Sequence, residues 1–94
     1  MAQTKVVNVG YRRYQVLTTN SFTDNEGIFD RIDLAERVLI RNLGAEDIKL
    51  RLNHPLADVI TIPGNQELNL PVKVKKVILD SGTAGNLEII GYSE

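Results

Sequence analysis

The sequence predicts an all-β protein, a compact antiparallel β-sandwich of the jelly-roll or Ig-like kind with about seven short strands. The apolar residues are mostly Leu, Ile and Val, with no Trp, two Phe and three Tyr, and branched aliphatic side chains favour strands. Apolar and polar residues alternate in several segments, as in a strand with one buried face. Turn-forming residues separate these segments about every 10 residues, which is typical of sandwiches and barrels.

Length and composition indicate one domain, residues 1–94, because two domains would each have too small a core. The chain has no Cys, which excludes disulfides, thiolate metal ligands and a cysteine nucleophile. Small domains without disulfides or structural metal ions often gain stability by assembling, so we expect a homo-oligomer. The formal net charge of −1 is too small to indicate a highly charged partner such as a nucleic acid or an anionic membrane.

Two strands are predicted near the N-terminus, at residues 5–9 and 14–18. Residues 1–10 are also expected to act as an N-terminal arm. Residues 19–27 contain Asn, Ser, Thr, Asp and Gly in quick succession, so a polar loop is expected there. Because loops and arms often carry contact surfaces, we expect both segments to touch neighbouring subunits.

The segment 28–42 has two interpretations. Apolar residues follow one another with helical spacing from Ile28 to Leu39, and Gly44 could close a helix, so one alternative is a short helix near residues 28–35. Residues 38–40, however, are Val, Leu and Ile in a row, which is unusual for one stripe of a helix and common in a buried strand. A strand over residues 36–42 is therefore favoured.

Five further strands are predicted after Gly44. The clearest is Ile48–Leu52, where apolar residues alternate with charged ones. Residues 67–74 alternate in the same manner, but Pro71 lacks a ladder donor and indicates an edge position or a bulge. The other three are short β-branched runs between turn residues, at positions 59–62, 76–79 and 87–90.

No residue set supports catalysis, and we predict that the protein is not an enzyme. His54 is the only histidine and lies in an Asn-His-Pro turn, while Ser81 has no nucleophile-elbow motif around it. Residues 82–85, Gly-Thr-Ala-Gly, lack the Lys-Ser/Thr pair of a phosphate-binding loop and are expected to form a hairpin turn. No cofactor is predicted.

Metal ions, nucleic acids and membranes are not predicted partners either. The acidic run that begins at Asp24 does not place its carboxylates at the alternate positions of a calcium loop, and one histidine cannot make a transition-metal site. Lys73, Lys75 and Lys76 have no aromatic residues among them for stacking on bases, whereas Tyr11 and Tyr14 flank Arg12 and Arg13 and leave nucleic-acid binding as a third, weaker hypothesis. The longest apolar runs are a few residues, far below the roughly 20 that span a bilayer.

From residue 34 to residue 92 the chain resembles the small β-sandwich virion proteins of tailed bacteriophages and prophages. The segments that carry the resemblance are Arg41-Asn42-Leu43-Gly44, the strand from Ile48 to Asn53, Ile60-Thr61-Ile62-Pro63-Gly64, and Leu87-Glu88-Ile89-Ile90-Gly91-Tyr92. Proteins of this family decorate or cement capsids or form neck and tail parts. The resemblance implies a virion structural protein that is made in the host cytoplasm and contacts a major capsid, neck or tail protein.

Carbohydrate-binding modules and adhesins share this pattern of strands and turns, so a glycan-binding β-sandwich is the alternative. A sugar site usually presents exposed aromatic rings, and without Trp the candidates are Tyr11, Tyr14 and Tyr92. For the favoured function, the candidate partner contacts are basic and aromatic residues before the first long loop and polar residues within it. They are Tyr11, Arg12, Arg13, Tyr14, Asp24, Asn25 and Glu26.

Overall fold

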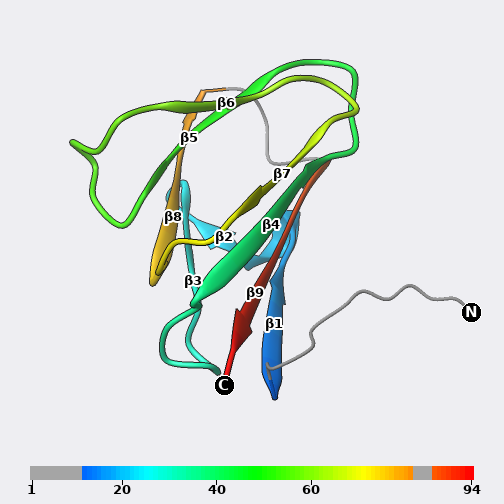
Figure 1. The fold of residues 1–94 in the computed structure, drawn as a ribbon. Coiled ribbons are helices and arrows are strands. Elements are labelled where there is room, and N and C mark those ends of the chain that lie inside the picture. The colour runs from blue at the N-terminus through cyan, green and yellow to red at the C-terminus, as the bar shows by residue number, and fades with distance from the viewer. Residues whose placement is uncertain (1–11, 82–85) are drawn as a thin grey trace, which may run out of the picture.

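The computed structural model describes residues 12–81 and 86–94, which form two antiparallel sheets packed as a sandwich (Figure 1). Sheet A has the strand order β1-β9-β4-β7, and sheet B has the order β2-β3-β8-β5-β6. The strands are β1 (Arg13–Leu17), β2 (Phe22–Thr23), β3 (Glu26–Ile28), β4 (Arg37–Asn42), β5 (Ile48–Leu52), β6 (Ile60–Ile62), β7 (Glu67–Leu70), β8 (Lys76–Ser81) and β9 (Leu87–Ser93). The predicted β-sandwich is confirmed.

The seven predicted strands that fall within the described residues are all present, as β1 and β4 to β9. β7 ends directly before Pro71 and lies at the edge of sheet A, the position that a residue without a backbone donor favours. The strand predicted at residues 5–9 and the arm at residues 1–10 lie outside the described residues.

The loop predicted for residues 19–27 is wrong in one respect, because it contains structure. A 3-10 turn (Thr19–Ser21) leads into β2, and β2 pairs with β3 as a short hairpin at the edge of sheet B. The two residues of its turn, Asp24 and Asn25, have positive φ angles of 52° and 67°. Asp and Asn tolerate this left-handed conformation, which two-residue hairpin turns require.

The helix considered near residues 28–35 does not form. The backbone of this segment bonds to other elements: the Phe29 N–H donates to the Lys75 carbonyl, and Ala35 exchanges two hydrogen bonds with Val74. Phe29, Ala35 and the intervening Ile32 are buried, whereas Ile28, the first residue of the supposed helical stripe, is 45% exposed. Tertiary hydrogen bonds thus hold the segment as an irregular plug over one end of the core.

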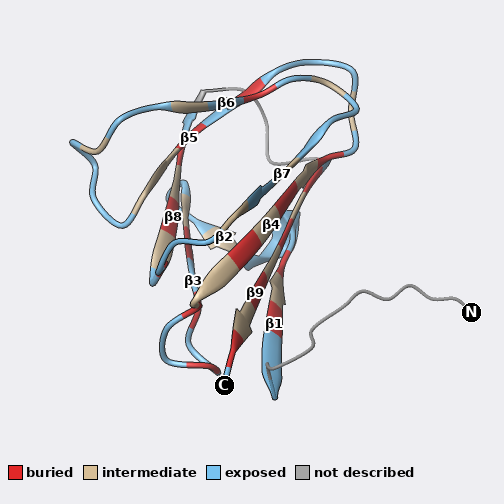
Figure 2. Cartoon of the chain, viewed as in Figure 1, coloured by how far each residue is buried: buried red, intermediate tan, exposed pale blue. Residues whose placement is uncertain are grey.

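The core lies between the two sheets, and Figure 2 colours the buried residues of the chain red. Its side chains come from β1, β4, β5, β6, β8 and β9 and from four residues outside the strands, Phe29, Ile32, Ala35 and Val74. Burial alternates along β4 and β9, so that every second residue enters the core. The core residues are Leu17, Phe29, Ile32, Ala35, Val38, Ile40, Ile48, Leu50, Ile62, Val74, Val77, Leu79, Leu87 and Ile89.

Asn42 is a buried polar residue at the end of β4, and its side chain joins the turn after β4 to sheet B. Its Nδ2 donates to the carbonyls of Glu46 and Ile62, at 2.6 and 3.0 Å, and its Oδ1 accepts from the N–H of Gly44 at 3.0 Å. A buried amide with all three bonds made is stabilising, whereas an apolar replacement would leave those backbone groups without partners.

Gly91 is the point of closest approach between β9 and the plug. A Cβ atom at this position would lie 2.6 Å from Cε1 of Phe29 and 2.8 Å from Cβ of Ala35. Gly91→Ala is therefore expected to lower the free energy of unfolding by about 1–3 kcal/mol, through overpacking of a filled core. Urea denaturation of the purified variant measures this loss.

Gly27→Ala is the matched control. Its Cβ would lie 3.0 Å from Cζ of Phe22, whose half-buried ring can turn away. The control should lose clearly less stability than Gly91→Ala, and equal losses would contradict the packing argument.

Candidate protein–protein interface

The outer face of sheet A carries an apolar stripe. The register of β4 with β9 places Arg37 beside Tyr92, Leu39 beside Ile90 and Arg41 beside Glu88, and these residues alternate with the buried ones. They therefore point away from the core. β1 adds Tyr14 beside Tyr92 and Val16 beside Ile90. We call the five uncharged residues the sheet A stripe: Tyr14, Val16, Leu39, Ile90 and Tyr92.

Polar residues border the sheet A stripe. On one side, the Arg41 guanidinium lies 2.8 Å from a carboxylate oxygen of Glu88 and 3.4 Å from one of Glu67. On the other side, Arg37 donates to the side-chain oxygen of Asn69 at 2.8 Å. An uncharged centre that contains aromatic residues, with charges at its border, is the usual anatomy of a protein–protein interface.

The outer face of sheet B is different. Lys49, Arg51, Lys76 and Asp80 occupy it, and the apolar residues Ile28 and Ile78 lie among them. Two ion pairs cross this face, Arg51 with Asp80 at 3.0 Å and Lys76 with Glu26 at 3.6 Å. Charged, mutually paired side chains are typical of a solvated face. Both outer faces therefore carry ion pairs, and the outer face of sheet A differs in having five uncharged aliphatic and aromatic side chains next to one another.

Tyr14 and Tyr92 form a cross-strand aromatic pair at one end of the stripe. Tyr14 is 61% exposed and Tyr92 is partly buried. Burial raises the pKa of the Tyr92 phenol above its ordinary value of 10.0, and the neighbouring Tyr14 raises it further. Both effects disfavour a phenolate, because it would be poorly solvated and next to a second phenolate.

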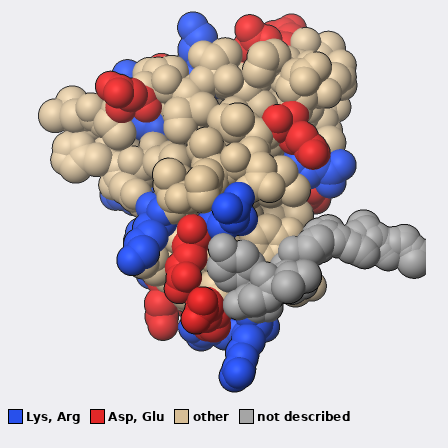
Figure 3. Space-filling view, in the orientation of Figure 1, with Lys and Arg blue, Asp and Glu red and all other residues tan. Residues whose placement is uncertain are grey.

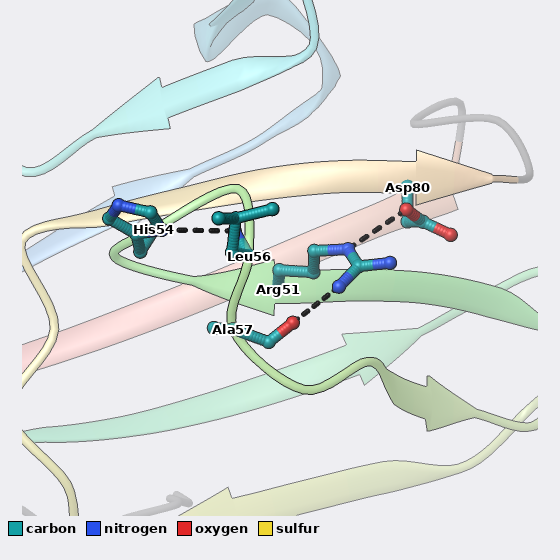
Figure 4. A network of polar contacts seen from close by, with 5 residues as sticks. All are labelled: Arg51, His54, Leu56, Ala57 and Asp80. Atoms are coloured by element: carbon teal, nitrogen blue, oxygen red, sulfur yellow. Dashed lines mark hydrogen bonds and ion pairs between the residues drawn. The ribbon is translucent and has the colours of Figure 1, made fainter.

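The connection between β5 and β6 projects from the sandwich and is a second exposed feature (Figure 1). Figure 4 shows how it is held: Arg51 bridges the Asp80 carboxylate and the carbonyl of Ala57, and the Leu56 N–H donates to Nδ1 of His54 at 3.0 Å. Leu56 lies on this connection and is 84% exposed. Single exposed leucines are common on protein surfaces, so Leu56 alone identifies no binding site.

Two recesses flank the turn that follows β4. One has a volume of about 240 Å³ and is lined mostly by residues 42–48, and the other, of about 290 Å³, lies between residues 41–43 and 65–67. Asn42 belongs to both, and its side chain is already engaged by backbone groups. Neither lining brings a nucleophile and a general base together.

On the side of the molecule that Figure 3 shows, the charged residues do not gather by sign. Lys and Arg occur there in small clusters mixed with Asp and Glu, with uncharged surface between them. Such a surface has no continuous basic track for a phosphate backbone. Within residues 12–81 and 86–94, no three His, Cys, Asp or Glu side chains converge as metal ligands. None of the helical structure in that part of the chain is long and apolar enough to cross a membrane.

The residues that the sequence singled out lie in two places. Tyr11 is outside the described residues. Arg12 and Arg13 are exposed beside the C-terminus, where the Arg12 N–H donates to the Ser93 carbonyl and Arg13 Nε to the Glu94 carbonyl.

Asp24 and Asn25 form the β2–β3 turn on sheet B, and Glu26 pairs with Lys76. The six candidates that the structure describes therefore do not form one surface, because β1 belongs to sheet A and β2 and β3 to sheet B. Of these six, only Tyr14 belongs to the sheet A stripe.

The other residues of the stripe were not predicted as contacts, although the sequence contains a signal for them. Val38-Leu39-Ile40 and Ile89-Ile90 are continuous apolar runs, which place apolar side chains on both faces of their strands. Ile48–Leu52, by contrast, alternates with charged residues. These runs indicate that Leu39 or Ile90 could lie outside the core, but Val77-Ile78-Leu79 on sheet B is also a continuous run, so the register was needed to locate the stripe.

Comparison with known proteins adds no relative: no family model matches the chain, and searches of characterised proteins and of solved structures found no significant match. The resemblance to phage virion proteins therefore stays a prediction from the sequence.

The pKa of Tyr92 gives a test of the aromatic pair. Since the pKa is raised by folding, the unfolded chain ionises first as the pH rises above 10.0, so stability is full below that pH and falls as the pH passes through the folded pKa. Titration by phenolate absorbance should show a transition with a raised pKa that disappears in Tyr92→Phe. In Tyr14→Phe it should move back toward 10.0 and remain measurable, and an unchanged titration there would contradict the pairing.

Proposed function

We propose that this chain is a structural protein of a bacteriophage virion, either a capsid decoration or cement protein or a head–tail component, that works through contacts with other virion proteins. The observation that carries the proposal is the sheet A stripe, five uncharged aliphatic and aromatic residues that lie side by side on the outer face of sheet A and are bordered by charged side chains. The resemblance of residues 34–92 to virion proteins supplies the biological setting.

The apolar side chains of the sheet A stripe indicate that this face binds a protein and does not remain in contact with water. Half-exposed Val, Leu and Ile side chains beside two tyrosines gain free energy when a partner removes them from water, at about 25 cal/mol per Å² of apolar surface. A chain of 94 residues has a small core that supplies limited stability, and a homo-oligomer would add to it by burying this surface. Repeated copies on a particle would then combine many small contacts.

The test is whether the protein belongs to a particle. Particles induced from the host strain that encodes the chain are purified on a density gradient and analysed by mass spectrometry, and the purified chain is sedimented with and without them. We expect peptides of this chain in the particle fraction and co-sedimentation of added protein. A chain absent from the particles that also stays unbound in their presence would contradict a virion role.

The Tyr14–Tyr92 pair supports a second candidate, glycan binding, because exposed aromatic rings can stack on sugar rings. The discriminating measurement is a glycan array with the wild-type protein and Tyr14→Ala. A glycan signal that Tyr14→Ala removes would favour a sugar-binding module over a virion protein, and no signal with either protein would argue against it.

A further inference from the structure

We propose that the outer face of sheet A binds the same face of a second copy of this chain, around a twofold axis that runs between β4 and β9 and parallel to them. The stripe residues of β4 and β9 then meet at the centre, and Tyr14 and Val16 on β1 lie over β7 of the second copy. This inference rests on the proposed assembly function and deepens it by naming the partner of this face. It follows from the pairing of the two central strands of sheet A, in which each outward residue of β4 lies beside an outward residue of β9.

The symmetry converts each pair within a sheet into a pair between copies. A twofold axis in the plane of the interface and midway between the strands places β4 of one copy over β9 of the other. Each outward residue then faces the counterpart of its own register partner. Arg41 faces Glu88 of the second copy, Leu39 faces its Ile90, and Arg37 faces its Tyr92, and each contact occurs twice.

All three contacts are favourable. Arg41 and Glu88 have opposite charge, and both are partly exposed, so each can meet a group from outside its own sheet. Leu39 and Ile90 would form an apolar centre from which water is excluded. Arg37 would lie over the ring of a tyrosine, the arrangement in which a guanidinium is attracted to an aromatic face. Aligned packing of two sheets, with strand directions within about 30°, accommodates this arrangement.

The alternative axis, perpendicular to the strands, is disfavoured by charge. It would place β4 over β4 of the second copy and invert the order of residues along the strand. Arg37 would then face Arg41 of the second copy and Tyr92 would face its Glu88, while at the centre Leu39 would face Leu39 and Ile90 would face Ile90. Like charges set against each other at an interface are costly, so the charge pattern selects the parallel axis.

The size of the face predicts a weak dimer. Four strands about 4.8 Å apart and the 7 residues of β9 at about 3.3 Å each outline a face of roughly 450 Å². Two such faces bury about 900 Å², which is below the roughly 1,200 Å² of a standard stable interface. A contact of this size suits a subunit that a particle holds at high local concentration.

The experiment uses charge reversal in two variants of the full chain, Arg41→Glu and Glu88→Arg. Each variant alone would place like charges opposite each other in its own dimer, and its dissociation constant should rise about tenfold or more over wild type. In an equimolar mixture, the new carboxylate of the first variant would face the new guanidinium of the second, and the unchanged Glu88 of the first would face the unchanged Arg41 of the second. Sedimentation velocity from about 1 µM to about 1 mM should therefore show that the mixture recovers the association of the wild type.

The mixture separates a contact between copies from a structural effect. Each variant also loses the 2.8 Å ion pair within its own sheet, and mixing cannot restore that pair. Recovery on mixing thus requires position 41 of one copy to lie on position 88 of another. If a reversed charge disturbs folding, as judged by circular dichroism, the pair Leu39→Glu and Ile90→Arg applies the same logic one row along the strands.

Ile78→Asp is the matched control for a charge placed on a half-buried apolar residue, because Ile78 lies on the outer face of sheet B. It should associate as wild type does, whereas Leu39→Asp should not. A mixture that associates no better than its single variants would overturn the proposal. So would a wild-type chain that stays monomeric over the whole range.

The outcomes for the proposed function remain distinct from these. A wild-type chain that is monomeric in solution but present on purified particles retains the virion role and loses the twofold contact. A chain that dimerises as described but is absent from particles retains the contact and loses the virion role.

Discussion

The antiparallel pairing of β4 with β9 is the interaction on which the rest of the structure depends. It runs over six residue pairs through the centre of sheet A, and it fixes both faces of that sheet at once. Inward residues of the two strands supply the core and outward residues supply the sheet A stripe, because a register shift by one residue would exchange the two sets. Asn42 lies at one end of this pairing, where its side chain holds the turn after β4. Gly91 lies near the other end, where its lack of a side chain leaves room for Phe29 and Ala35.

The two outer faces of the sandwich suit different surroundings, water for sheet B and another protein for sheet A. β5 places Lys49 and Arg51 outside, and the ion pairs of sheet B keep that face in water at little energetic gain. Sheet A also places aliphatic and aromatic side chains on its outer face, and exposing this apolar surface to water is unfavourable. A face of roughly 450 Å² would hold two free copies together weakly, yet the same contact repeated on a particle is reinforced by every neighbouring contact. Weak pairwise binding and firm attachment to a lattice are thus compatible.

Most of the fold was predictable from the sequence because strand periodicity is local, and the seven strands predicted within the described residues are present. The helix near residues 28–35 was a wrong alternative because long-range hydrogen bonds, from Phe29 to Lys75 and between Ala35 and Val74, decide that segment. The β2–β3 hairpin was missed because Asp24-Asn25 lacks the glycine that usually signals such a turn. The stripe was missed for a different reason: Leu39 and Ile90 look like core residues until the register shows which side of the sheet they occupy.

The residues around Tyr14 and Tyr92 favour assembly over glycan binding as the function of this surface. A sugar site combines an exposed ring with converging polar groups that bind hydroxyls. Here the pair continues along the strands into Val16, Ile90 and Leu39, and the polar groups of Arg41 and Asn69 already bond to neighbouring side chains at the border. An apolar surface that extends beyond the tyrosines matches another protein face better than the hydroxylated face of a sugar. The aromatic pair is therefore best explained as one end of a protein-binding surface.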